Sequence, residues 1–296
     1  MASRSLLRRS TKSEIIRLAI WKAFGQTGMR LFRTRPLKET PNIDAVTAVF
    51  LCGLHRSGTS VLHRILRQSD QVDSFKDTGV PEDEGQHLQT VFPAARKLGG
   101  PGIFAFSSGA HLTEKNAFSL GPKRDLLLRE WGAYINFDFS FFVEKSPPNL
   151  LRTRFFQGIF PKSKFIVIVR HPIAVAIATS EKWNIGLEQS LDHWIKAHQI
   201  FLEDQKLLID NTILSYENLC RYPQKTLSFI SEFLGLELEL GEETLKNMNR
   251  EYFNKWSRLD SRLKSRLEEK LNDANETLKL LGYENWRLFE NFSGNV

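Results

Sequence analysis

The sequence predicts an α/β protein whose central parallel sheet is covered by helices on both faces. Apolar runs of β-type residues occur at 45–52, 164–170 and 212–216, and a segment with helical spacing of apolar residues follows each of them. The first run is almost continuously apolar, which is typical of a strand covered on both sides in a parallel sheet. We therefore expect a three-layer αβα architecture.

The first strand, Ala45–Cys52, leads into a glycine-framed loop and then a helix. Gly53 and Gly58 have the spacing of the phosphate-binding motif G-x-x-x-x-G-K-[ST], but Thr59 stands where that motif has lysine. Backbone N–H groups around 57–59 and the positive end of the following helix would bind a phosphate. The missing lysine argues against γ-phosphoryl transfer.

Two further strands end on basic side chains. The run at 141–145 ends on Lys145 and is stopped by two prolines, so this lysine is expected in the crevice at the carboxyl ends of the strands. The run at 164–170 ends on Arg170, and the next helix carries Thr179 and Ser180. An arginine near hydroxyls would form a second anion site, and two such sites imply a bisphosphorylated nucleotide.

The segment between the first helix and residue 122 is expected to face a second substrate. Its first part, 72–93, is polar and acidic and could supply a general base, although a solvated loop explains most of its charges taken singly. Residues 94–122 are rich in Gly and Ser and resemble a long loop or lid. The base candidates are Asp77, Glu82, Glu84 and His87.

The rest of the chain is predicted to be largely helical. Helical patterns occur at 126–134 and 187–208, and a further helix begins at Pro223 and is capped by Gly235. His193 and His198 are five residues apart, so they do not share the helix face that a metal needs; no metal site is expected. The leucine-rich stretch 256–281 predicts one amphipathic helix packed on the sheet.

Composition and charge favour an ordinary soluble protein of 296 residues, with 41% hydrophobic residues. No apolar run reaches the roughly 18 residues that would span a bilayer, and no signal peptide is evident. Cys52 and Cys220 are too few for a disulfide framework and are expected to be buried thiols. A cytoplasmic location is therefore expected.

The net charge of +7 is concentrated in an N-terminal arm, residues 1–42, that precedes a domain at 43–296. Residues 1–40 hold ten basic and two acidic side chains, so the domain itself is nearly neutral, and no nucleic-acid partner is expected. Residues 10–32 have apolar side chains at helical spacing. They would make peripheral membrane contact, dock on the domain or serve as a targeting segment.

Four motifs, in this order, resemble the P-loop-like sulfotransferase superfamily: Gly53-Leu-His-Arg-Ser-Gly-Thr-Ser60, Glu144-Lys-Ser-Pro-Pro148, Phe165-Ile-Val-Ile-Val-Arg-His-Pro172, and Leu214-Ser-Tyr-Glu-Asn-Leu219 with a downstream Phe-Leu-Gly-Leu. The resemblance spans about residues 46–283. It is nearest to the tyrosylprotein and glycan sulfotransferases, because the Arg-Lys-Gly signature of the cytosolic small-phenol enzymes is absent.

The resemblance implies 3′-phosphoadenosine 5′-phosphosulfate (PAPS) as sulfate donor. By the match of motifs, Arg170 would hold the 3′-phosphate and Tyr216 would lie near the adenine. The family's serine for the 3′-phosphate falls on Ala178, and either Thr179 or Ser180 could replace it. The residues that would hold the 5′-phosphosulfate are Arg56, Ser57, Gly58, Thr59 and Ser60.

The implied chemistry is in-line transfer of a sulfuryl group to an acceptor hydroxyl. Lys145 matches the family's catalytic lysine and, with Arg56, would stabilise the negative charge that develops. Glu84 is the preferred general base and His87 the alternative. The acceptor is left open among a glycan, a small molecule and a peptide tyrosine. The other functions considered are a kinase or NTPase of the same fold and a catalytically silent, membrane-associated binding protein.

Overall fold

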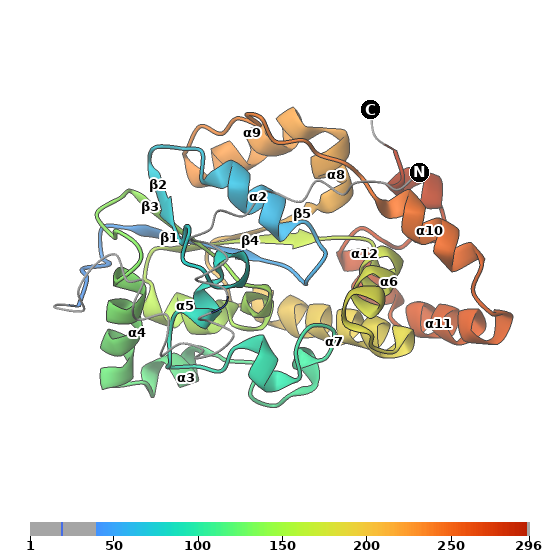
Figure 1. The fold of residues 1–296 in the computed structure, drawn as a ribbon, viewed down its shortest axis with the longest axis horizontal. Helices are drawn as coiled ribbons and strands as arrows, with labels where there is room; N and C mark the ends of the chain where they lie inside the picture. The colour runs from blue at the N-terminus through green and yellow to red at the C-terminus, as the bar shows by residue number, and fades with distance from the viewer. Residues whose placement is uncertain (1–18, 20–39, 295–296) are drawn as a thin grey trace.

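Five parallel strands form the single sheet of the described chain, in the order β2-β3-β1-β4-β5 (Figure 1). The computed structural model describes residue 19 and residues 40–294, so nearly all of the predicted arm, including its membrane-contact segment, lies outside the described residues. The strands are β1 Thr47–Cys52, β2 Val72–Ser74, β3 Phe141–Lys145, β4 Ser163–Val169 and β5 Asn211–Ser215.

Helices cover both faces of this sheet, which confirms the predicted three-layer architecture (Figure 1). One face carries α2 Thr59–Leu66, α8 Tyr216–Arg221 and α9 Pro223–Leu234, whose buried residues pack in one apolar core. The larger core on the opposite face takes its buried residues from the other helices: α3 Glu114–Phe118, α4 Pro122–Gly132, α5 Thr153–Ile159, α6 Pro172–Trp183, α7 Leu187–Gln205, α10 Asn249–Ser257, α11 Ser261–Asp273 and α12 Asn275–Leu280.

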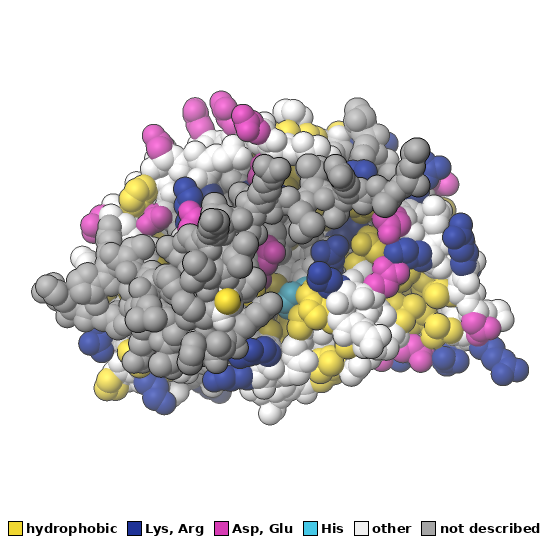
Figure 2. Space-filling model, viewed as in Figure 1, with side chains coloured by type: hydrophobic (Ala, Val, Ile, Leu, Met, Phe, Trp, Pro, Cys, Tyr) yellow, Lys and Arg dark blue, Asp and Glu magenta, His cyan; other side chains and the backbone are white. Residues whose placement is uncertain are grey.

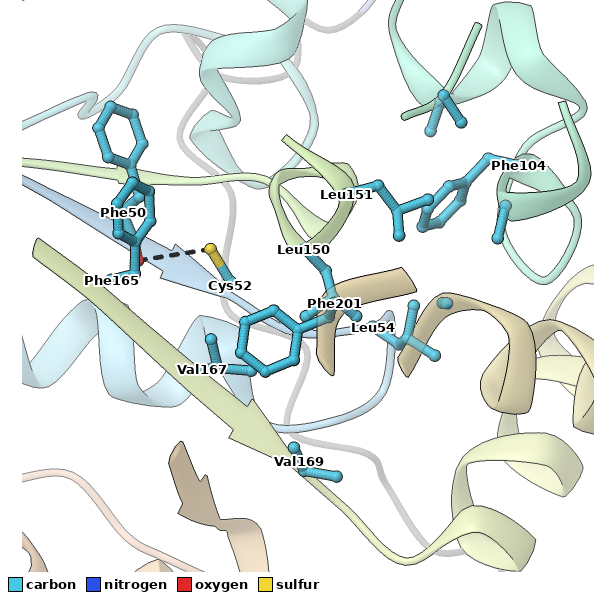
Figure 3. Packing of buried hydrophobic residues seen from close by; sticks show 14 of the residues in the cluster. Phe50, Cys52, Leu54, Phe104, Leu150, Leu151, Phe165, Val167, Val169 and Phe201 are labelled. Carbon is cyan, nitrogen blue, oxygen red and sulfur yellow. Dashed lines mark hydrogen bonds between the residues drawn. The ribbon is translucent and has the colours of Figure 1, made fainter. Parts of the chain in front are cut away.

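The alternation of side chains along a strand divides the residues of β1 and β4 between the two cores. Phe50 of β1 stacks on Phe165 of β4, with ring centroids 5.6 Å apart, and both belong to the larger core. Val49 and Ile166 face the other core. Figure 3 shows the larger core near the strand ends, where the buried Cys52 thiol donates to the carbonyl of Phe50. Both strands are therefore covered on each face, as their apolar sequences predict.

The sheet brings the functional strand ends to one edge. β1 pairs with β3 on one side and β4 on the other, and all pairings are parallel. Loops that leave the carboxyl end of β1 therefore lie at the point where the order of the strands reverses, which is where open α/β sheets bind ligands. Lys145 ends β3, Arg170 follows β4 and Tyr216 follows β5.

Two regions differ from the sequence prediction. The acidic segment contains the short edge strand β2, which extends the sheet beyond β3. The tail at 256–281 is not one helix: α10 ends at Ser257, α11 begins at Ser261 and α12 begins at Asn275. Asp260 caps α11, since its carboxylate accepts from the N–H groups of Arg262 and Leu263. The prediction of a single tail helix is therefore wrong, since an N-cap competes with helix continuation at this point.

The segment between β2 and α4 is mostly irregular. It contains the 3₁₀ turns η2 Pro81–Asp83, η3 Gly85–His87, η4 Ala95–Leu98 and η5 Phe104–Phe106, followed by α3. These short turns joined by loops form a long irregular connection, as the Gly-rich sequence predicts. Among the described residues, no helix is both long and apolar enough to cross a membrane.

Candidate functional site

The loop after β1 has the left-handed backbone that an anion-binding turn requires. Gly58 has φ 98° and directly precedes α2, and Arg56 has φ 71°. A Cβ on Gly58 would lie 2.6 Å from Cδ2 of Tyr216, so only glycine allows the tyrosine ring to approach the loop so closely. The sequence 53–60 therefore folds as a compact turn at the start of a helix, in which the N–H of Ser57 donates to the carbonyl of Leu54 at 3.1 Å. The first N–H groups of α2 remain for an anion.

A cavity of about 380 Å³ opens beside this loop, over the carboxyl ends of β1, β4 and β5. On the molecular face shown in Figure 2, Lys and Arg side chains border a hollow in which a histidine side chain is visible. The cavity lining combines the loop and α2 with one segment from the tail: Arg56, Gly58, Thr59, Ser60, Val61, Arg64, Arg170, Tyr216, Cys220, Thr244, Leu245, Lys246, Met248 and Tyr252.

Arg170 is fixed in this cavity with one nitrogen free for a ligand. Its Nε donates to Oδ1 of Asn249 and its Nη1 to the carbonyl of Arg56, both at 2.8 Å. Its guanidinium lies over the Tyr216 ring, 4.4 Å from the centroid. The buried Nη2 has no hydrogen-bond partner in the part of the chain that the structure describes. Because buried arginine nitrogens are normally paired, this atom fits a bound anion.

A buried network behind Arg170 holds its orientation. Asn249, which accepts from the arginine, donates through Nδ2 to Oε1 of Glu217 at 2.6 Å. The other oxygen of Glu217 accepts from the hydroxyl of Tyr283 at 2.7 Å. Glu217 is thus linked to Arg170 through Asn249, and the positive charge of the guanidinium remains available to a ligand in the cavity.

The hydroxyls of the loop differ in their surroundings. Ser57 is fully buried, and its Oγ has no partner among residues 40–294. Thr59, at the position of the missing lysine, is 5% exposed and lines the cavity. Ser60 also lines it and donates to Oε2 of Glu82 at 3.0 Å. The loop therefore offers hydroxyl groups and the first N–H groups of α2 as donors, with Arg56 as its cation.

Thr179 and Ser180 do not lie in this cavity. Thr179 packs near Gly102, and the Ser180 hydroxyl donates to the carbonyl of Ile185 at 2.7 Å. Neither residue lines the cavity around Arg170. The suggestion that one of them replaces the hydroxyl missing at Ala178 therefore has no support in the geometry, because α6 directs both side chains toward other parts of the fold.

Lys145 and Glu84 form a buried ion pair on the opposite side of β1. Their Nζ and Oε1 atoms are 3.1 Å apart, and the residues are 1% and 6% exposed. Burial raises the pKa of Glu84, and the positive charge of Lys145 opposes that rise. Gln86 donates to the other carboxylate oxygen. The fold thus brings together Lys145 and Glu84, the two candidate residues that the sequence analysis identified in separate segments.

The other base candidates are less well placed. His87 Nε2 is 3.8 Å from Oε2 of Glu84, and burial lowers the pKa of His87 to about 4, with the charges of Arg96 and Lys145 acting in the same direction. Asp77 and Glu82 are exposed. Glu84 is the candidate carboxylate that lies buried against Lys145.

A second buried carboxyl supports the turn that carries Glu84. Glu144 accepts from the backbone N–H of Gly85 at 2.9 Å and from Ser146 Oγ at 2.6 Å, and Asn149 also donates to it. Burial raises the pKa of Glu144 to about 7, although these hydrogen bonds act against the rise. The end of β3 and the turn after Glu84 are therefore locked together.

Two histidines that sequence reasoning did not select lie near this centre. His55 directly precedes Arg56, and its ring contacts Trp183 and Phe104 at centroid distances of 5.2 and 6.0 Å. His193, expected to be an ordinary helix residue, packs 4.5 Å from Phe104. The position of His55 inside the phosphate loop could have identified it from the sequence, whereas the contact of His193 with Phe104 depends on tertiary packing.

These features define a P-loop-like α/β protein with an anion cavity and an adjacent lysine–carboxylate pair. A model described as "Sulfotransferase family" matches residues 48–240, more than half of the chain. The chain therefore belongs to the sulfotransferase family, and its expected membership of that superfamily is confirmed. The nearer likeness to the tyrosylprotein and glycan branch stays a prediction.

Similar solved structures are also sulfotransferases. The sulfotransferase domain of the Synechococcus PCC 7002 olefin synthase is 18% identical, with a TM-score of 0.46, and the match covers 79% of this chain and 98% of that one. The Alicyclobacillus acidocaldarius sulfotransferase is 14% identical, with a TM-score of 0.45 and coverages of 81% and 98%. A sequence search among curated proteins found no match.

Proposed function

We propose that the chain transfers a sulfuryl group from PAPS to an acceptor hydroxyl. The observation that carries the proposal is the Nη2 atom of Arg170, which has no hydrogen-bond partner among the described residues. It shares a cavity with a phosphate-type loop that lacks the lysine of nucleotidases. A donor with phosphates at two positions accounts for both anion sites. PAPS is such a donor, and the family supports it.

The residues of the cavity fit this donor. Arg56, Ser57, Gly58, Thr59 and Ser60 would hold the phosphosulfate end, and Arg170 would hold the 3′-phosphate. Tyr216, whose ring lies beneath the guanidinium and against Gly58, would form a wall for the adenine. Bound PAPS would supply the sulfuryl group, whose bond to the bridging oxygen breaks as the acceptor oxygen bonds to sulfur.

The chain's own contribution to transfer is charge stabilisation and proton removal. Lys145 and Arg56 supply the positive charge that stabilises oxygens on which negative charge develops. Glu84 takes the proton of the acceptor hydroxyl, and the adjacent ammonium of Lys145 favours the ionised carboxylate that this role requires. The ion pair thus holds the acid and the lysine together in a buried setting.

The test is sulfate transfer from ³⁵S-labelled PAPS to a mixed panel of hydroxyl acceptors, with products identified by an added sulfate mass. The expected result is a labelled product that Lys145→Ala does not form. Calorimetry with adenosine 3′,5′-bisphosphate and with ATP provides the second readout. Tight binding of ATP without binding of the bisphosphate would favour the kinase or NTPase alternative and overturn the proposal.

A further inference from the structure

A second group of polar side chains lies between the phosphate loop, η5, α6 and α7, and the proposed chemistry does not use it. It consists of His55, Thr179, Ser190 and His193, here called the polar cluster. Each contributes a buried atom that has no hydrogen-bond partner within the described part of the chain: His55 Nδ1, Thr179 Oγ1, Ser190 Oγ and His193 Nε2.

Residues 102–106 lie against all four of these side chains. A Cβ built on Gly102 would lie 3.0 Å from Cγ2 of Thr179 and 3.5 Å from Oγ of Ser190. Phe104 then contacts both imidazoles, those of His55 and His193, at 6.0 and 4.5 Å between centroids. Ser190 and His193 are three residues apart on α7 and so share a helix face.

The cluster is buried and uncharged. Thr179, Ser190 and His193 are 4%, 2% and 3% exposed, and His55 is partly exposed although its Nδ1 is buried. Burial lowers the pKa of both His55 and His193 to about 3. Each imidazole is therefore neutral near pH 7, with one nitrogen that donates and one that accepts. Buried polar groups are nearly always hydrogen-bonded. We therefore expect a bound molecule to supply the hydrogen-bond partners of these four atoms.

Electrostatics connect the cluster to the reaction centre. Burial lowers the pKa of His55, and the positive charges of Lys145 and Arg56 act in the same direction. His55 also directly precedes Arg56 in the loop. A molecule held by the cluster would thus extend toward Lys145 and the loop.

Aromatic side chains border the cluster. Trp183 of α6 contacts His55, with centroids 5.2 Å apart. Phe106 contacts His193 at 6.0 Å and is 48% exposed, so it forms an apolar edge that solvent reaches. Flat apolar faces beside several hydrogen-bonding atoms match a ring that carries hydroxyls around its edge.

We propose that the polar cluster is the acceptor subsite and that it binds a neutral polyhydroxylated ring, a sugar or a comparable cyclic polyol. The inference rests on the proposed sulfotransferase function. A phenol or tyrosine side chain brings one hydroxyl and would leave most of the cluster unpaired, which is unfavourable for buried groups. The cluster itself carries no positive charge that would pair with an anionic acceptor, because its two imidazoles are neutral.

The first test measures transfer from PAPS to methyl glucoside, methyl galactoside and myo-inositol, with 4-nitrophenol and a tyrosine peptide as comparison acceptors. We expect higher kcat/KM for at least one polyol. His193→Phe keeps the ring volume and removes both nitrogens, so KM for that polyol should rise about tenfold, with the Kd of adenosine 3′,5′-bisphosphate unchanged. His111→Phe, at a partly exposed histidine paired with Asp204, is the matched control and should leave KM unchanged.

A second variant and a binding measurement protect the test against misfolding. Ser190→Ala removes only one hydroxyl and should raise the same KM about threefold. Saturation-transfer NMR on the complex with adenosine 3′,5′-bisphosphate should detect the bound polyol without turnover, with a weaker signal in both variants. Loss of the polyol signal in Ser190→Ala or His193→Phe, in a protein that still binds the bisphosphate, supports the subsite.

The outcomes separate the two proposals. Sulfation of a phenol or tyrosine peptide, with a KM that neither variant changes, would overturn the polyol inference and leave the sulfotransferase function intact. Ordered water at all four atoms, together with an unchanged polyol KM in both variants, would also overturn it. Absence of bisphosphate binding and of transfer to every acceptor would overturn both proposals.

Discussion

The two sides of β1 are built differently. On the β4 and β5 side, the cavity is lined by residues at strand ends and helix starts, and Arg170 is held by a network through Asn249 and Glu217. On the β3 side, the wall is a chain of 3₁₀ turns and loops between β2 and α4. Regular elements thus position the proposed anion site, whereas loops form the side where we expect the acceptor to be selected.

Backbone conformation sharpens this comparison. Asp77, Glu82 and Asp83 all have φ between 51° and 54°, a left-handed conformation that is uncommon for residues other than glycine. In the phosphate loop, Arg56 is in the same region. Such strain persists only when the surroundings hold it, so the turn before Glu84 depends on its contacts with β3.

The largest expected effect is on the chemistry of the β3 side. Glu84→Gln should lower kcat by about 10² to 10⁴-fold, because a general base contributes on that order. Exposed Glu203 on α7, changed to Gln, is the matched control. Binding of adenosine 3′,5′-bisphosphate should change little in either variant, as calorimetry would show.

The pH profile discriminates Glu84 from His87. Glu84 must be ionised to act as base, and burial raises its pKa above the ordinary value of 4.5. The acidic limb of the kcat/KM profile, in which activity rises with pH, should therefore lie above pH 4.5. A limb near pH 4 would instead point to His87, whose pKa is lowered to about 4. Rates between pH 3.5 and 8 provide the measurement, and retention of the limb in Glu84→Gln would exclude Glu84.

On the cavity side, Arg170→Ala should weaken binding of adenosine 3′,5′-bisphosphate by about 10- to 100-fold, since a hydrogen bond to a charged group is worth roughly 1.5–3 kcal/mol. Arg266→Ala, which removes an arginine 54% exposed on α11, should leave the Kd unchanged. Equal loss in the two variants would show that general charge, and not the cavity, determines affinity.

A smaller effect is expected behind the cavity. Asn249→Ala removes the acceptor of the Arg170 Nε and a donor to Glu217, so the arginine loses its orientation but keeps its charge. The Kd should rise about three- to tenfold. An Asn249→Ala Kd as weak as that of Arg170→Ala would mean that Asn249 contacts the nucleotide itself.

The smallest effect on activity is expected for Glu144, which should instead control stability. With a folded pKa of about 7 and an ordinary value of 4.5, it binds a proton in the folded state over that interval. The free energy of unfolding should therefore fall as pH rises from 4.5 to 7, by up to about 3 kcal/mol from this group. Urea unfolding of Glu144→Gln should show a flatter pH dependence; an unchanged slope would contradict the assignment.

The sequence predicted the parts of the site that depend on one segment or on parallel-sheet geometry. The phosphate loop is contiguous, and Lys145 and Arg170 end neighbouring strands whose carboxyl ends must meet. The sequence predicts separate roles for Glu84 and Lys145 but not their ion pair, because the distance between the two side chains depends on the path of the irregular segment. The break at Asp260 had a readable N-cap signal, which the leucine periodicity masked.

What the sequence did not reveal depends on packing between distant elements. His193 reaches Phe104 because η5 lies against α7, and no local pattern in the helix indicates that contact. Thr179 does not line the cavity around Arg170, since its spacing from Arg170 in the sequence does not specify which element its face of α6 packs against. Both residues lie on helices that pack against the irregular segment between β2 and α4, where tertiary contacts decide the arrangement.

The most direct measurement compares Lys145→Ala with Arg170→Ala in the same two assays, the Kd of adenosine 3′,5′-bisphosphate and the rate of sulfate transfer from PAPS at saturating donor. The account predicts that Lys145→Ala loses at least about 100-fold in rate with a nearly unchanged Kd, because it removes transition-state stabilisation. Arg170→Ala should lose binding first. An equal loss of binding in both variants would contradict the division between the two sides of β1.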